Sequence, residues 1–245
     1  MILETFTHKE IYTTLRKAYT ILQDRSKSYL SNNYNKIFSL CKDNDYERVV
    51  QGTINNQRFS LGVCYKRIGK SVIYGANTLH TVFLCGYRKF VIKMYPYGPN
   101  VESVQYGIAY FTEHFLNRFC ERLHLCPSDT PLLEKARLYD MNTDLKIHGS
   151  FDDNIISRFH EPSLNVPFLA KENRRISCEC YKNGDIAIVE YYDKITVSRT
   201  YITKDMLFDS QLNDSSYIET VAKSLADQDK EGDRECIPEQ FLKRN

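Results

Sequence analysis

The chain has 245 residues, of which 42% are hydrophobic and 26% are charged, and its formal net charge at pH 7 is +2. Such a composition excludes a disordered or fibrous chain and indicates a folded protein with one large or two small domains. The net charge is too small to indicate nucleic-acid binding by itself, so any basic patch must be local.

Cysteine usage and hydropathy favour a cytoplasmic protein. The eight cysteines lack the regular short spacing of a secreted disulfide scaffold. The N-terminus has no apolar region typical of a signal peptide, and no apolar run approaches the roughly 20 residues of a membrane span. We therefore expect reduced, mostly buried thiols and no membrane partner.

Residues 8–41 have the periodicity of helices. Apolar side chains recur at helical spacing from Ile11 through Leu15 to Leu22, and the polar break at 31–33 predicts two helices rather than one. We assign residues 1–46 to this N-terminal helical segment. Whether it packs on the main body or projects as an arm stays open.

From Glu47 the hydrophobic period changes to two, which is typical of strands. Turn residues at Asn55-Asn56, Gly69 and Gly86 separate the strands, and a loop at 96–100 ends the block. The pattern predicts an antiparallel meander with strands at Arg48–Ile54, Phe59–Lys66, Ser71–Tyr74, Leu79–Cys85 and Tyr87–Tyr95.

Ser103–Pro127 predicts a short strand followed by a helix. Thr112 can cap the helix, Glu113 suits the positive end of its dipole, and Cys126-Pro127 stops it. An apolar stripe that anchors the helix to a core consists of Phe111, Phe115, Phe119 and Leu123.

A second helix follows from Pro131 to Lys146, and residues 147–174 lack periodicity and predict a long loop. Residues 175–203 predict a second meander of three antiparallel strands, with a strong hairpin signal at Asn183-Gly184. A short helix that starts at Thr203 or Asp205 and contains Met206 and Leu207, and a further helix at Ser215–Ala226, complete the expected order.

These elements predict an α+β fold, with antiparallel meanders, N-terminal helices and a central helical segment. The body would span 47–228, with strands at 47–97 and 175–203, and the charged residues 229–245 would form a tail. Whether the two strand blocks form one sheet stays open.

His114, Arg118 and Arg122 fall four apart, so on a helix they form one basic stripe. RNA cleavage needs a base for the 2′-hydroxyl proton and cationic donors for the charge on phosphorus. The stripe therefore indicates a metal-independent site for a phosphodiester, without a cofactor. The alternative is a solvated basic flank whose arginines pair locally with Glu113 and Glu121.

The order of helix, helix, irregular segment and a meander containing SRTYITKDML resembles the small-toxin ribonucleases, which are related in fold to RelE and barnase. The motif HFLNRFCER, followed by a strand that bears Thr200, is similar to the H-x-x-x-R-x-x-x-R helix of such toxins. The chain also resembles uncharacterised proteins of Bacteroides-type mobile elements.

The resemblance implies an endoribonuclease in which His114 is the base, Arg118 and Arg122 hold the phosphate, and Thr200 supports them. The alternative is a non-catalytic protein of a mobile element that binds nucleic acid or a protein partner. Both functions stay open at this stage.

Further candidate sites are weaker. One strand face carries aromatic and basic residues suited to stacking bases and neutralising phosphates, namely Tyr87, Lys89, Lys93 and Tyr95. Its alternative is the solvent side of a sheet. Hydroxyls at Thr196, Ser198 and Thr200 share a strand face and could contact a phosphate backbone, although Thr is also simply a good strand former. Cys120, His124, Cys178 and Cys180 could form a zinc site only by a long-range coincidence, so we predict no metal.

Overall fold

The computed structural model describes residues 2, 6–42, 45–97, 105–142, 147–149, 174–181, 185–192 and 195–207. Within these ranges it has four α-helices and nine strands, and the strand order is β1-β2-β3-β4-β5-β9-β8-β7-β6. Strands β1–β3 and β6–β9 pair antiparallel, whereas β5 and β9 run parallel. The predicted α+β fold with antiparallel strands and N-terminal helices is confirmed.

The described residues form two compact units. Unit one contains the residues up to Phe83 together with Ile92–Ile108, and unit two contains Leu84–Val91 and the described residues from Ala109 onward. Strands β3, β4 and β5 therefore each carry residues of both units.

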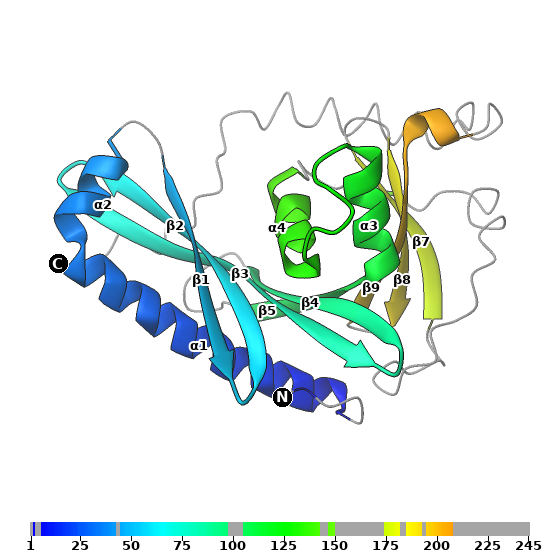
Figure 1. The fold of residues 1–245 in the computed structure, drawn as a ribbon, viewed down its shortest axis with the longest axis horizontal. Helices are drawn as coiled ribbons and strands as arrows, with labels where there is room; N and C mark the ends of the chain where they lie inside the picture. The colour runs from blue at the N-terminus through cyan, green and yellow to red at the C-terminus, as the bar shows by residue number, and fades with distance from the viewer. Residues whose placement is uncertain are drawn as a thin grey trace. The chain divides into compact units, whose positions relative to one another are not determined.

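Unit one begins with two helices, as predicted. Helix α1 (His8–Asn32) starts at a capping box, in which the Thr7 hydroxyl accepts from the Glu10 amide and the Glu10 carboxylate accepts from the Thr7 amide. Helix α1 is capped at Asn33, and a second helix, α2 (Tyr34–Leu40), follows. Figure 1 shows α1 lying along the first strands, on which it packs with its buried apolar stripe.

The hairpins of unit one follow the turn residues. Strand β1 (Tyr46–Ile54) turns through Asn55 and Asn56, which both have positive φ (49° and 60°), into β2 (Gln57–Ile68). Two left-handed residues are what a type I′ turn requires, and asparagine tolerates that conformation. Gly69 and Gly86 also have positive φ, as expected for the next two turns.

The next strand differs from the prediction. A single strand β3 (Ser71–Cys85) replaces the two that were expected, because a register shift lets it continue past the polar residues 77 and 78. The Tyr19 hydroxyl donates to the Ala76 carbonyl at 2.9 Å, beside this shift. Strand β4 (Arg88–Tyr97) also runs further than predicted and includes the first two residues of the expected 96–100 loop.

After Leu84–Val91, unit two continues from the end of β5 (Gln105–Thr112), where the chain passes directly into α3 (Glu113–Arg122). The helix ends four residues before the predicted stop at Cys126. Helix α4 (Leu132–Asn142) follows, and a short strand β6 (Ile147–Gly149) occupies the start of the expected loop.

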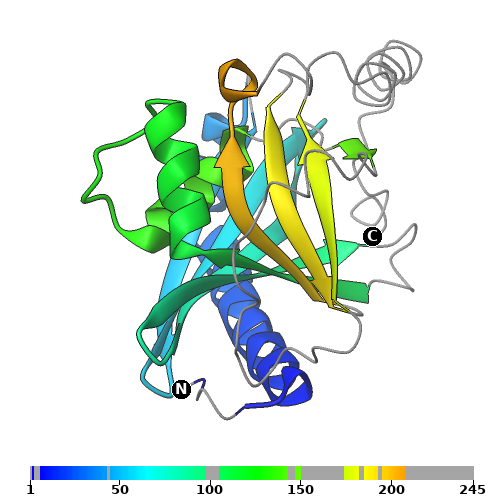
Figure 2. The ribbon, with the colours of Figure 1, turned by 90° about the vertical axis from the view of Figure 1, so that its right-hand side faces the viewer.

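The second meander is confirmed. It consists of β7 (Arg174–Cys180), β8 (Ile186–Tyr192) and β9 (Ile195–Ile202), followed by the short 3₁₀ helix η3 (Lys204–Met206). Figure 2 shows these strands side by side, with α3 against β9. The Asn183-Gly184 turn, the helix predicted at 215–226 and the tail lie outside the described residues.

An aromatic core joins the helices of unit two to its strands. The fully buried Tyr139 of α4 meets Phe111, Phe115 and Phe119 edge to face, with ring centroids 4.9–5.2 Å apart. Phe119 also contacts Tyr201 of β9 in the same manner. The prediction that the apolar stripe anchors α3 to a core therefore holds, although Phe111 lies in β5.

Replacing Gly107 by alanine should destabilise unit one, because the added Cβ would lie 2.5–2.8 Å from the ring of Tyr95. We expect a loss of about 1–3 kcal/mol in the free energy of unfolding, the usual cost of overpacking. The matched control is Gly62→Ala, whose Cβ meets Thr78 at an ordinary 3.7 Å. Urea denaturation followed by circular dichroism measures both, and equal effects would contradict the predicted clash.

Candidate functional site

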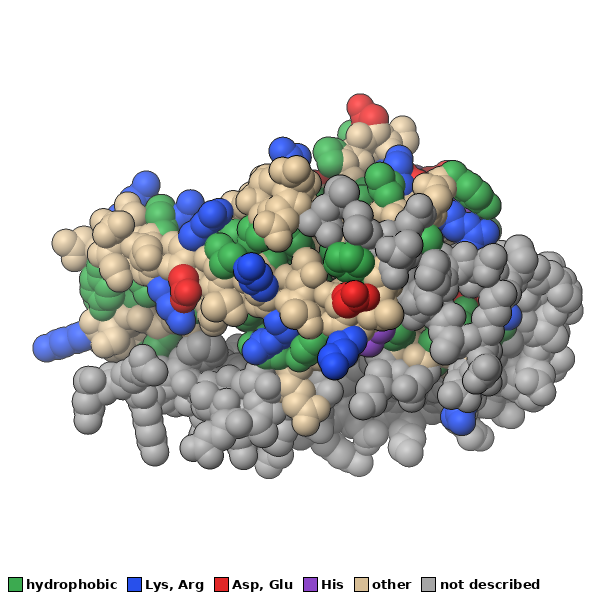
Figure 3. Space-filling view, turned by 90° about the horizontal axis from the view of Figure 1, so that it is seen from below, with side chains coloured by type: hydrophobic (Ala, Val, Ile, Leu, Met, Phe, Trp, Pro, Cys, Tyr) green, Lys and Arg blue, Asp and Glu red, His purple; other side chains and the backbone are tan. Residues whose placement is uncertain are grey.

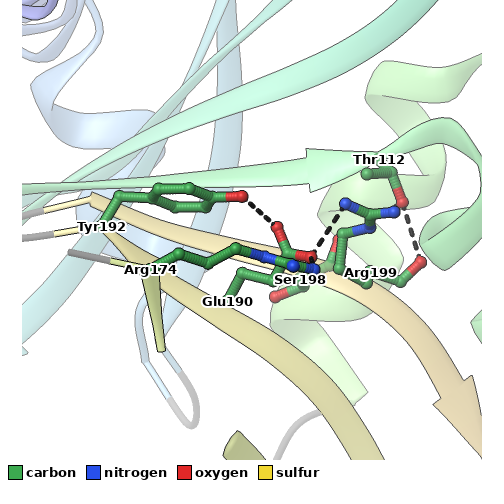
Figure 4. A network of polar contacts seen from close by, with 6 residues as sticks. All are labelled: Thr112, Arg174, Glu190, Tyr192, Ser198 and Arg199. Atoms are coloured by element: carbon green, nitrogen blue, oxygen red, sulfur yellow. Dashed lines mark hydrogen bonds and ion pairs between the residues drawn. The ribbon is translucent and has the colours of Figure 1, made fainter. Parts of the chain in front are cut away.

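The hydroxyl of Thr112 fixes the start of α3. It accepts a hydrogen bond from the Phe115 amide at 3.1 Å and so caps the helix, as predicted. The same hydroxyl donates to the Arg199 carbonyl at 3.0 Å, and the Ser198 carbonyl lies 3.3 Å away. Figure 4 shows this contact at the strand. The first turn of α3 is therefore held against β9.

This attachment brings two predicted site residues together. His114 Nε2 lies 3.4 Å from Thr200 Oγ1, although the two residues are 86 positions apart in the chain. The His114 side chain is exposed, whereas Thr200 is only 8% exposed. The imidazole thus reaches solvent at the edge of the helix, with the threonine hydroxyl behind it.

The two arginines of the stripe have different surroundings. Arg118 Nη1 lies 3.0 Å from Glu121 Oε2, in a pair whose side chains are largely exposed. Arg122 is half-buried, and burial followed by the nearby charge of Arg118 lowers its pKa, against the opposing effects of Glu121 and Asp205. Its Nη1 atom has no hydrogen-bond partner among the described residues. One guanidinium is therefore engaged locally, whereas the other has a buried Nη1 atom that no described residue satisfies.

The predicted row of hydroxyls in β9 is not a solvent-facing row. Ser198 and Thr200 are both buried. A register shift pairs Val189 with Ser198 and Ile188 with Thr200, so that Arg199 is an extra residue in β9. The bulge breaks the simple alternation on which the prediction rested.

The bulge residue belongs to a buried ionic network, shown in Figure 4. The fully buried Glu190 of β8 accepts from Arg199 Nη1 at 3.0 Å and from Arg174 Nη2 at 2.5 Å, both through Oε1. Its other oxygen accepts from the Tyr192 hydroxyl. Burial and then Glu190 raise the pKa of Tyr192, so the phenol stays a hydrogen-bond donor. Strands β7, β8 and β9 are thereby linked.

Sequence reasoning missed this network. A signal was present, because Glu190 ends an otherwise apolar run at 186–189, and a buried carboxylate needs a cationic partner. Arg199 stands among apolar residues in the next strand and could have been named as the cationic partner of Glu190. Arg174 could not have been assigned, since its strand was expected to begin one residue later.

Two residues of the predicted aromatic and basic face lie in unit two. Tyr87 is 89% exposed, in the turn between β3 and β4, and the Arg88 guanidinium carbon lies 5.6 Å from its ring centroid. Lys89 Nζ lies 3.3 Å from Glu113 Oε1, in the first turn of α3. The turn with its exposed ring therefore lies beside the helix that carries the basic stripe.

The other two residues of that face lie in unit one. Lys93 Nζ is 5.6 Å from the ring centroid of Tyr95, and that ring packs over Gly107. Figure 3 shows Lys and Arg side chains dispersed among hydrophobic ones on the face drawn. Tyr87 and Lys89 thus belong to unit two, whereas Lys93 and Tyr95 belong to unit one.

A pocket of about 590 Å³ lies at the C-terminal end of α3. Its lining includes the thiols of Cys120 and Cys126 and the buried Lys135, whose ammonium donates to Asn117 Oδ1 at 2.8 Å and to the Ser128 carbonyl at 2.7 Å. None of the four predicted catalytic residues lines it. This pocket was not predicted, although Cys120 had been considered as a zinc ligand.

The described residues contain no group of three or more His, Cys, Asp or Glu side chains arranged to hold a metal ion. Of the four residues of the zinc alternative, Cys180 has its side chain outside the described part of the chain.

Comparisons with protein-family models, with curated proteins and with solved structures gave no match to this chain. Among the described residues, none of the helices is both long and apolar enough to cross a membrane.

Replacing Glu190 by alanine should leave two cationic side chains at the buried site without their anion. We expect a loss of about 3–5 kcal/mol in the free energy of unfolding, the usual cost of breaking a buried pair. The matched control is Glu134→Ala, which removes a half-exposed pair with Arg137 and should cost about 1 kcal/mol or less. Chemical denaturation of both variants measures the difference, and similar losses would show that the network contributes no more than a surface pair.

Proposed function

We propose that this chain binds single-stranded RNA, without cleaving it, through an α3 surface made of Tyr87, Lys89, His114, Arg118 and Arg122. The observation that carries the proposal is the 3.3 Å contact between Lys89 and Glu113. This contact lies between the exposed aromatic turn and the helix with the basic stripe, so both belong to one surface of unit two.

The chemistry of this surface suits a single strand. An exposed tyrosine can stack on a base whatever the sequence, and the following cationic groups can lie along the phosphates. The surface pairs of Lys89 with Glu113 and of Arg118 with Glu121 contribute little to stability, because exposed ion pairs are weak. A phosphate of RNA can therefore replace either carboxylate. The half-buried Arg122 adds a further cationic group at the end of the stripe.

Metal-independent RNA cleavage is the second candidate function. The approach of His114 Nε2 to Thr200 Oγ1 at 3.4 Å favours it, since the base and its supporting hydroxyl would lie together. In that case the imidazole takes the 2′-hydroxyl proton, and Arg122 stabilises the charge that develops on phosphorus. Binding ranks first because His114 is exposed and none of the four predicted catalytic residues lines the pocket at the end of α3.

The cellular location and role that we propose follow from the resemblance to mobile-element proteins. We place the chain in the cytoplasm, where RNA is accessible, and a toxin-like role belongs to the second candidate function only. If the native chain does not bind RNA, we expect its partner to be a protein instead.

RNA binding is tested by fluorescence anisotropy with a labelled, unstructured RNA over a range of KCl concentrations. Arg122→Gln should lower the magnitude of the slope of log K against log salt by about 0.7, the contribution of one phosphate contact on a single strand. Tyr87→Ala should weaken binding roughly 5- to 100-fold through lost stacking. Lys17→Gln, an exposed cation of α1, serves as the control and should change neither quantity. Absence of binding by the native chain would overturn the proposal.

The same RNA, incubated with the protein and EDTA, distinguishes the two functions. We expect the strand to stay intact with the native chain and with His114→Gln at equal purity. Cleavage by the native chain that disappears in His114→Gln would instead establish the second candidate function. Cleavage that both proteins share would indicate a contaminating nuclease.

A further inference from the structure

The turn that ends α3 folds the chain back onto the helix. The Leu125 amide donates to the Cys120 carbonyl at 3.0 Å, and the His124 amide donates to the Glu121 carbonyl at 3.3 Å. Together with the positive φ of His124 (51°), these bonds form a Schellman motif. Cys126, the next residue, is thereby returned to the last turn of the helix, where Cys120 lies.

The two cysteines come together at the pocket at this end of α3. Both residues line it and both are free thiols, and the neighbouring Cys126 thiol, after burial, contributes to the raised pKa of Cys120. Their exposure differs, because Cys120 is only 1% exposed whereas Cys126 is half-buried. A reagent from solvent therefore meets Cys126 first.

Lys135 holds this arrangement in place. Its buried ammonium donates to Asn117 Oδ1 in α3 and to the Ser128 carbonyl in the connection between the helices. One side chain of α4 thus fastens both segments that carry the thiols. Its positive charge also favours the thiolate of Cys120, against the burial and the neighbouring thiol that together raise the pKa of Cys120 to about 12.

We propose that Cys120 and Cys126 are an oxidisable dithiol that forms an intramolecular disulfide with a low-molecular-weight disulfide such as oxidised glutathione. The thiolate of Cys126 attacks one sulfur of the small disulfide, the S–S bond breaks, and the first small thiolate leaves and takes up a proton. Cys120 then loses its proton and attacks the Cys126 sulfur of the mixed disulfide, which releases the second small thiol. Two protein thiols are oxidised, and one small disulfide is reduced to two thiols.

The order of attack follows from the surroundings of each thiol. Cys126 is the accessible nucleophile, and the buried Cys120 resolves the mixed disulfide that forms beside it. Buried Cys178 contrasts with Cys126, because it is only 1% exposed and burial raises its pKa to about 12.

The full chain is incubated with defined ratios of reduced to oxidised glutathione, alkylated with iodoacetamide and digested with trypsin. Because trypsin cleaves after Arg118, Arg122 and Lys135, the disulfide should link peptide 119–122 to peptide 123–135. Its yield at a fixed glutathione ratio should be at least about tenfold higher in the native protein than in urea, since the fold positions the sulfurs.

Three variants separate the two steps. Cys120→Ser should accumulate glutathione on Cys126, Cys126→Ser should leave Cys120 unmodified, and Cys178→Ser should match the native chain. A native chain that keeps glutathione on Cys126 without forming the link would overturn the proposal. Equal yields in native protein and urea would also overturn it. These readings use the unmutated chain and so do not depend on how the variants fold.

Discussion

The hydroxyl of Thr112 is the constraint on which the arrangement of α3 depends. It caps the helix through the Phe115 amide and ties the same helical turn to the Arg199 carbonyl of β9. Because the helix starts at a fixed point on the sheet, its phenylalanines face the core around Tyr139 and its basic stripe faces outward beside Thr200. One side chain thus sets both the packing and the exposed chemistry of the helix.

The strand to which Thr112 is bonded is itself held by buried charge. Arg199 lies at a bulge, and its guanidinium is turned to Glu190, which also binds Arg174 and Tyr192. A buried carboxylate between two guanidinium groups is stable only as a complete set, because each charge has lost its hydration. The network therefore favours one register for β7, β8 and β9, and that register positions the carbonyls that receive Thr112.

The two ends of α3 have separate chemistry. Near its start, His114 and the exposed turn at Tyr87 form the surface that we propose for RNA. At its end, the Schellman motif returns Cys126 to Cys120 beside the ammonium of Lys135. Glu121 lines the pocket and also pairs with Arg118, so the two regions share one carboxylate.

Local chemistry in the sequence determined the elements: the Asn55-Asn56 turn, the cap at Thr112, the stripe of phenylalanines and the second meander were all predictable, because each depends on residues a few positions apart. The helical spacing also placed His114, Arg118 and Arg122 on one face. Only the tertiary structure decided that β3 continues through its register shift and that Arg199 bulges toward Glu190. These features depend on which strand lies beside which, and residue periodicity carries no information about such long-range pairing.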